Sequence, residues 1–110
     1  MNIYDTANRL AQEIKTSDEY IKFKEAKQKL ESNNELKQKV EEFEKTRYEV
    51  QVLAMQGIKV EEEKNKKLQE MYTILIENKE IKEYFDLEVK FNVMIADVNK
   101  IIAEAVQDVL

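Results

Sequence analysis

The feature that most constrains the fold of this chain is its near lack of residues that make tight turns. One glycine and no proline occur among its 110 residues. Glycine and proline supply much of the backbone geometry that turns require, and a β-rich domain of this length would need many turns. Charged residues make up 37% of the chain, and apolar residues recur every three or four positions. We therefore expect a single all-α domain over residues 1–110, with about five helices. Its long helices should form an antiparallel hairpin or bundle, with short N-terminal helices packed against it.

Local signals predict where these helices begin and end. Thr16, with Glu19 three residues later, has the form of a capping box. Asn33 and Asn78 each precede a segment that opens with a glutamate in its first turn, and both are good N-cap residues. Gly57 follows a periodic run and is predicted to end a helix in the left-handed conformation.

Two segments carry the repeat of 3.5 residues that is typical of helices packed on helices. The first consists of Leu36, Val40, Phe43, Arg47, Val50 and Ala54. The second is longer and consists of Ile81, Tyr84, Glu88, Phe91, Ile95, Val98, Ile102, Ala105 and Val109.

The last segment also carries a second apolar strip beside the first, formed by Phe85, Val89, Ala96 and Ala103. A narrow polar line of Glu88, Asn92 and Asn99 separates the two strips. A helix that is apolar over more than half of its circumference usually meets neighbours on more than one side. One neighbour should belong to the same hairpin, and the other is either the first helix or a second subunit. The candidates for this oligomer or partner interface are Phe85, Glu88, Val89, Asn92, Ile95, Ala96, Asn99, Ile102 and Ala103.

The two asparagines in that polar line have two interpretations. A buried asparagine at a helix interface can fix the alignment and the number of the helices, at some loss of stability. Alternatively, Asn92 and Asn99 flank the interface and contact water.

The composition excludes most chemistry. The chain has no histidine and no cysteine, so the usual general bases, thiol nucleophiles and zinc ligands are missing. We therefore expect no enzymatic activity, no catalytic or metal-binding residues, no cofactor and no small-molecule substrate.

Charge and hydropathy narrow the possible partners. The net charge is -5 and no basic stripe occurs, which disfavours direct binding of nucleic acid. No apolar run approaches the roughly 20 residues that span a bilayer. Residues 3–14 could form a membrane-surface helix, but their mixed charges favour packing against the protein itself. A cytoplasmic location is expected.

Several motifs resemble those of one protein family. Near the start these are Asn2–Asp5 with Ala7 and Asn8, and Ser17–Tyr20 with Lys24–Ala26; further on they are Gln51 with Met55–Gly57, and Asn99–Ile102. Their order and spacing resemble the YlbF/YmcA family, and most closely its short YheA-like branch.

The resemblance implies a cytoplasmic, all-α protein of Gram-positive bacteria that forms dimers or larger assemblies. Better-studied members of the family resemble adaptors. They act with the protein YaaT and ribonuclease Y in RNA maturation, and they affect competence, sporulation and biofilm formation. Their complex is linked to iron–sulfur clusters held by cysteines, which this chain lacks.

Two hypotheses of function follow. The first is a non-enzymatic, oligomeric helical adaptor that regulates through contacts with copies of itself and with other helical proteins. The alternative is an RNA-associated regulatory factor that works within a ribonuclease complex.

Overall fold

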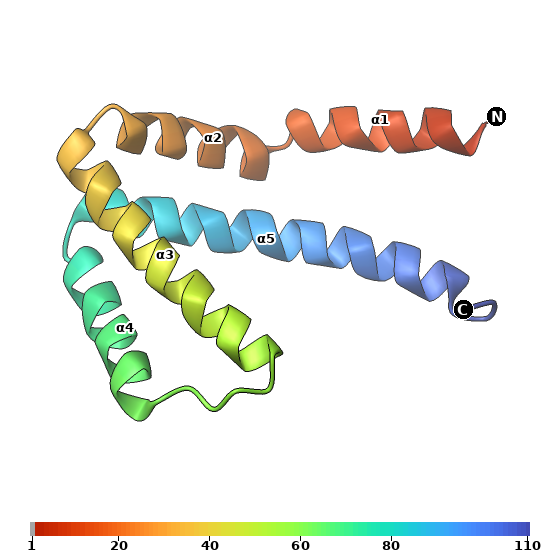
Figure 1. The fold of residues 1–110 in the computed structure, drawn as a ribbon. Helices are drawn as coiled ribbons and strands as arrows, with labels where there is room; N and C mark the ends of the chain where they lie inside the picture. Colours follow the sequence, from red (N-terminus) through yellow and green to blue (C-terminus); the bar gives the residue numbers. More distant parts are fainter. Residues whose placement is uncertain (1) are drawn as a thin grey trace. The chain divides into compact units, whose positions relative to one another are not determined.

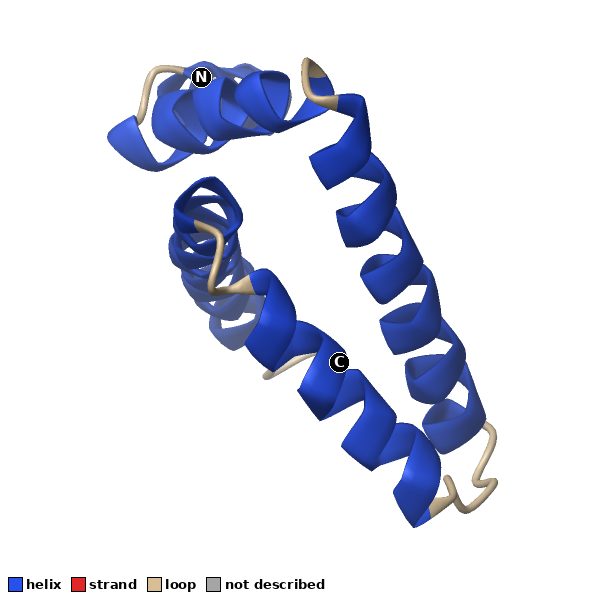
Figure 2. Cartoon of the chain, turned by 90° about the vertical axis from the view of Figure 1, so that its left-hand side faces the viewer, coloured by secondary structure: helices blue, strands red, loops and turns tan. Residues whose placement is uncertain are grey.

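The computed structural model describes residues 2–110, and these residues form helices and loops without strands (Figures 1 and 2). The helices are α1 (Ile3–Lys15), α2 (Asp18–Glu31), α3 (Asn34–Met55), α4 (Glu62–Leu75) and α5 (Lys79–Val106). The expected all-α fold with five helices is confirmed over this range. The two segments with the repeat of 3.5 residues became the two longest helices, α3 with 22 residues and α5 with 28.

Asparagine caps begin α3 and α5, as predicted. The Leu36 amide donates to the side-chain oxygen of Asn33 at 3.3 Å, and the Ile81 amide donates to that of Asn78 at 3.1 Å. Each bond satisfies one of the four amides that a helix start leaves without an internal partner.

Gly57 ends α3 in the predicted way. Its φ is +74°, in the left-handed region, and it is the one described residue in that region. The Gly57 amide donates to the carbonyl of Ala54, and the Ile58 amide donates to the carbonyl of Leu53. These two bonds form a Schellman motif, which satisfies carbonyls at the helix end.

The prediction for Thr16 was wrong. Thr16 ends α1, and its hydroxyl lies 3.1 Å from the carbonyl of Gln12, within its own helix. The hydroxyl that caps α2 belongs to Ser17, and it accepts from the Tyr20 amide at 3.2 Å. Thr16 is the C-cap residue of α1, directly after Lys15, and its amide and hydroxyl are engaged with that helix, so the next hydroxyl along the chain caps α2.

The chain divides into two compact units. The hairpin unit comprises Gln28–Glu83, and the terminal unit comprises the residues up to Lys27 together with Tyr84–Leu110. Both α2 and α5 contribute residues to each unit.

The hairpin unit is built around the antiparallel pair α3 and α4, which a short loop joins (Figure 1). The Phe43 ring of α3 packs against the Tyr72 ring of α4, with their centroids 5.9 Å apart. The Arg47 guanidinium also lies over the Phe43 ring, 5.5 Å from its centroid. The buried side chains of the unit are Leu30, Val40, Phe43, Leu75 and Ile81.

The terminal unit is organised by aromatic contacts between α2 and α5. The Phe23 ring lies 5.5 Å from both Tyr84 and Phe91, and the Tyr20 ring lies 6.1 Å from Phe91. Tyr20 contacts Phe91, whereas Phe23, which comes later in α2, contacts Tyr84, which comes earlier in α5. The two helices are therefore antiparallel here. The buried side chains of this unit are Tyr84 and Phe85, and no residue of α1 is buried.

Candidate interaction surface

The face of α5 on which the interface candidates lie is largely exposed beyond Phe85. Every residue from Asp86 to Leu110 is at least partly accessible to solvent. Val89 is 59% exposed and Ile102 is 52% exposed, although both are apolar residues of a long helix. Isolated apolar residues on a surface are ordinary, whereas an ordered row of them indicates a surface that another protein covers.

The candidates differ in how far the structure exposes them. Glu88 and Ile95 are half-buried, whereas the exposed candidates are Val89, Asn92, Ala96, Asn99, Ile102 and Ala103. Phe85 requires a correction. It is only 4% exposed and its ring lies 5.7 Å from that of Tyr84, so it belongs to the core of the chain and is not available to a partner.

The opposite side of α5 is better covered. Leu87, Phe91, Met94 and Val98 are half-buried, and Phe91 contacts the rings of Tyr20 and Phe23 from α2. At about 100° per residue these side chains lie on a different side of α5 from Val89 and Ala96. The expectation that α5 has two apolar sides is therefore consistent with its burial: one side faces α2, and the other is exposed.

α1 carries a second exposed apolar surface in the same unit. Ile3 is 78% exposed and Tyr4 is 74% exposed, while Leu10 and Ile14 are half-buried. A helix of 13 residues is only marginally stable by itself in water, so its apolar face needs a partner. The sequence had indicated an amphipathic helix here, but it could not indicate how much of that face would remain open.

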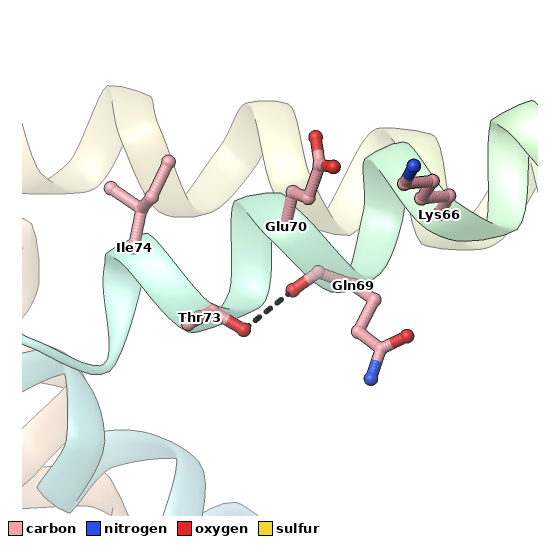
Figure 3. Close-up of a pocket in the computed structure, with 5 residues that line it drawn as sticks. All are labelled: Lys66, Gln69, Glu70, Thr73 and Ile74. Carbon is pink, nitrogen blue, oxygen red and sulfur yellow. Dashed lines mark hydrogen bonds between the residues drawn. The ribbon is translucent and has the colours of Figure 1, made fainter.

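Two hollows lie among the described residues of the hairpin unit, on α3 and α4. A depression on α4 is lined by Lys66, Gln69, Glu70, Thr73 and Ile74, all from this one helix (Figure 3). The Thr73 hydroxyl donates to the Gln69 carbonyl at 2.9 Å, so it is engaged within the helix. Figure 3 shows the Lys66, Glu70 and Ile74 side chains projecting side by side rather than converging on one point.

A narrower hollow of about 160 Å³ lies between α3 and α4. It is lined by Thr46, Glu49, Val50, Leu53, Lys64 and Lys67. The Thr46 hydroxyl donates to the carbonyl of Glu42 at 3.0 Å, again within its own helix. A hydroxyl has one proton to donate, so the Thr46 hydroxyl is not activated by Glu49, the one carboxylate among these lining residues.

Neither a candidate metal site nor a candidate membrane span occurs among residues 2–110. No cluster of three or more carboxylates could hold a metal ion. No helix in this range is both long enough and apolar enough to cross a membrane.

Comparison with known proteins gives a consistent result along the chain. The profile of the family described as "Control of competence regulator ComK, YlbF/YmcA" matches residues 3–107. A UPF0342 protein of Caldicellulosiruptor saccharolyticus is 41% identical over 105 residues, which cover 96% of this chain and 88% of that protein. A UPF0342 protein of Desulfitobacterium hafniense is 36% identical and is matched along 100% of this chain and 89% of its own length.

A solved structure shows the same fold. A protein of unknown function (DUF964) from Bacillus stearothermophilus superposes with a TM-score of 0.84, covering 96% of this chain and 93% of its own. At 16% sequence identity, this similarity concerns the fold alone.

Proposed function

The chain belongs to the YlbF/YmcA family, and we propose that it is a non-enzymatic regulatory adaptor that self-associates and binds other helical proteins through α5 and α1. The description of the family refers to control of a competence regulator, which suits a protein that acts through contacts rather than through chemistry. The same proposal includes that the cellular process in which this chain acts is a regulatory one.

The observation that supports the proposal is the exposed apolar surface of the terminal unit. Val89 and Ile102 expose more than half of their surface, and Ile3 exposes more than three quarters. Burying one such aliphatic side chain contributes about 1.5–3 kcal/mol. A few of them covered together would offset much of the entropy lost when two proteins associate.

Self-association is tested by sedimentation equilibrium over a wide range of concentrations. We expect the parental chain to be a dimer or larger. The double variant Val89→Asp/Ile102→Asp should have a dissociation constant at least tenfold higher than that of the parental chain, because it places carboxylates in the apolar surface. Tyr48→Asp is the matched control, since Tyr48 is 67% exposed but lies in the hairpin unit. A parental chain that stays monomeric at about 100 μM would contradict self-association.

Adaptor function is tested by co-purification from the native host, with the same double variant as the control. We expect the parental chain to recover a helical protein that the variant does not recover, and the two purified proteins to reassemble in vitro. Recovery of the chain's own copies alone would contradict the adaptor proposal. A partner that is lost after ribonuclease treatment would instead support the RNA-associated alternative.

A further inference from the structure

Among the helices of residues 2–110, α1 is the one that has no buried side chain. Leu10 and Ile14 are half-buried, and every other residue of α1 is exposed. A segment with few buried apolar side chains opens at a low cost in free energy, because little apolar surface leaves the protein interior when it unfolds. The helical state of α1 therefore depends mainly on interactions within α1 itself.

These internal interactions are weak. α1 has only 13 residues, which is close to the lower limit for a helix that is stable alone in water. Its ion pair joins Arg9 Nε to Glu13 Oε1 at 3.6 Å, and both side chains are exposed, so solvent screens the attraction. The basic member comes first along the helix, which is the less favourable order for a pair at this spacing.

The short joint Thr16–Ser17 separates α1 from α2 (Figure 1). The Ser17 hydroxyl accepts from the Tyr20 amide at 3.2 Å, and the Ser17 carbonyl accepts from the Ile21 amide at 3.0 Å. Both bonds lie on the α2 side of the joint. The Ser17 hydroxyl also donates to the carbonyl of Ile14, and water can replace that bond when α1 unfolds. The start of α2 thus stays capped without α1.

The helix that follows the joint is held by contacts that do not involve α1. The Tyr20 ring packs against Phe91, and the Phe23 ring packs against the buried Tyr84. The hairpin unit has its own buried side chains, which lie in residues 28–83. Local unfolding that begins at the N-terminus therefore meets its first tertiary resistance at the start of α2.

We propose that α1 is an arm that unfolds and refolds independently, with its boundary at Thr16–Ser17, while α2 and the hairpin unit stay folded. This opening is a property of the single chain and holds whether or not the chain self-associates. Its consequence bears on the proposed adaptor. A partner that covers Ile3 and Tyr4 must also order α1, so α1 acts as an order–disorder switch of that surface.

Hydrogen–deuterium exchange over a series of dilutions tests the boundary. At the lowest concentration, we expect the amides of residues 7–15 to exchange within about tenfold of the rate of an unstructured peptide. The amides of α2 after Ile21 should exchange at least about tenfold more slowly than those of α1, and the amides around Val40 at least about a hundredfold more slowly. Equal protection of α1 and α2 at the lowest concentration would overturn the proposal, whatever the oligomeric state.

A proline in each helix tests independence by a second route. Ala7 and Tyr48 are both exposed, so neither substitution removes a buried side chain, and each proline removes a helix hydrogen bond and clashes with the preceding turn. We expect Ala7→Pro to leave the exchange of the amides around Val40 unchanged within about twofold. Tyr48→Pro, the matched control in α3, should speed that exchange by about a hundredfold or more.

The outcomes distinguish this inference from the proposed function. Exchange around Val40 that is tenfold or more faster in Ala7→Pro, or a variant that fails to fold, would show that α1 and the hairpin unit unfold together, and would overturn the proposal. A parental chain that is monomeric at every concentration would contradict self-association and leave the independent opening of α1 intact.

Discussion

α3 and α5 carry the same repeat of apolar residues, but the structure covers them to different extents. In α3 the repeat is covered at its centre: Val40 is 2% exposed and Phe43 is 4% exposed, and half-buried or exposed positions flank them. In α5 the burial ends at Phe85, and no residue from Asp86 onwards is buried. The same pattern therefore predicts in both helices that a face is covered, but not whether this chain or another one covers it.

Truncating the α3 seam should have the largest effect. Phe43→Ala removes a buried ring that contacts Tyr72, and we expect a loss of about 3–5 kcal/mol in the free energy of unfolding. Urea denaturation followed by circular dichroism measures this loss. Tyr48→Ala, in the same helix but exposed, should change stability by less than about 0.5 kcal/mol. Equal losses in the two variants would contradict the assignment of the core to one face of α3.

An enlarged side chain on α5 should act through association instead. Ala96→Glu places a long, charged side chain in the exposed apolar surface of α5, and we expect the proposed self-association to weaken by about 2 kcal/mol, or roughly 30-fold. The helix content of the dissociated chain should not change, because Ala96 is exposed. Isothermal calorimetry of dilution measures the dissociation constant of the self-associated chain. An unfolded variant would show instead that Ala96 supports the fold of the chain itself.

Gly57 ends α3, and α5 has no comparable residue. Gly57→Ala should lower the free energy of unfolding by about 1–2 kcal/mol, because a left-handed φ disfavours a side chain. No atom lies within 4 Å of the added Cβ, so the loss is conformational rather than steric. Gly57→Asn should recover part of it, since asparagine tolerates this region best after glycine. Thermal unfolding of both variants tests the order, and an alanine variant as stable as the parental chain would contradict it.

The caps of the two long helices provide the smallest and most closely matched comparison. Asn33→Ala and Asn78→Ala should each cost about 1 kcal/mol, since each removes one bond to a helix amide. The loss should be greater at Asn78, where the bond is partly buried, than at Asn33, where it is exposed. Chemical denaturation of the two variants measures the difference. A larger loss at Asn33 would contradict the role that we assign to burial.

What the sequence could predict depends on whether the determinant is local. Asn33, Asn78 and Gly57 act on neighbouring amides and carbonyls, and their roles were recognisable from a few residues. Thr16 failed because Ser17 offers an equivalent hydroxyl one position later, and the length of α1 decides between them.

The side chains that the rest of the chain buries were less predictable. Phe85 and Val89 lie on the same predicted strip, yet one is buried and the other is exposed. Their difference depends on where neighbouring helices begin and end, which the periodicity of one helix does not contain. The surface of α5 could thus be located in the sequence, but its inner limit at Phe85 could not.

Hydrogen–deuterium exchange at several protein concentrations tests most directly the claim that another copy covers α5. We expect amides in residues 89–103 to exchange at least tenfold more slowly as the concentration rises through the dissociation constant, because association suppresses local opening of the helix. Amides of α3 around Val40 and Phe43, which the chain covers itself, should exchange at the same rate at every concentration. An α5 whose exchange is independent of concentration, like that of α3, would contradict the account.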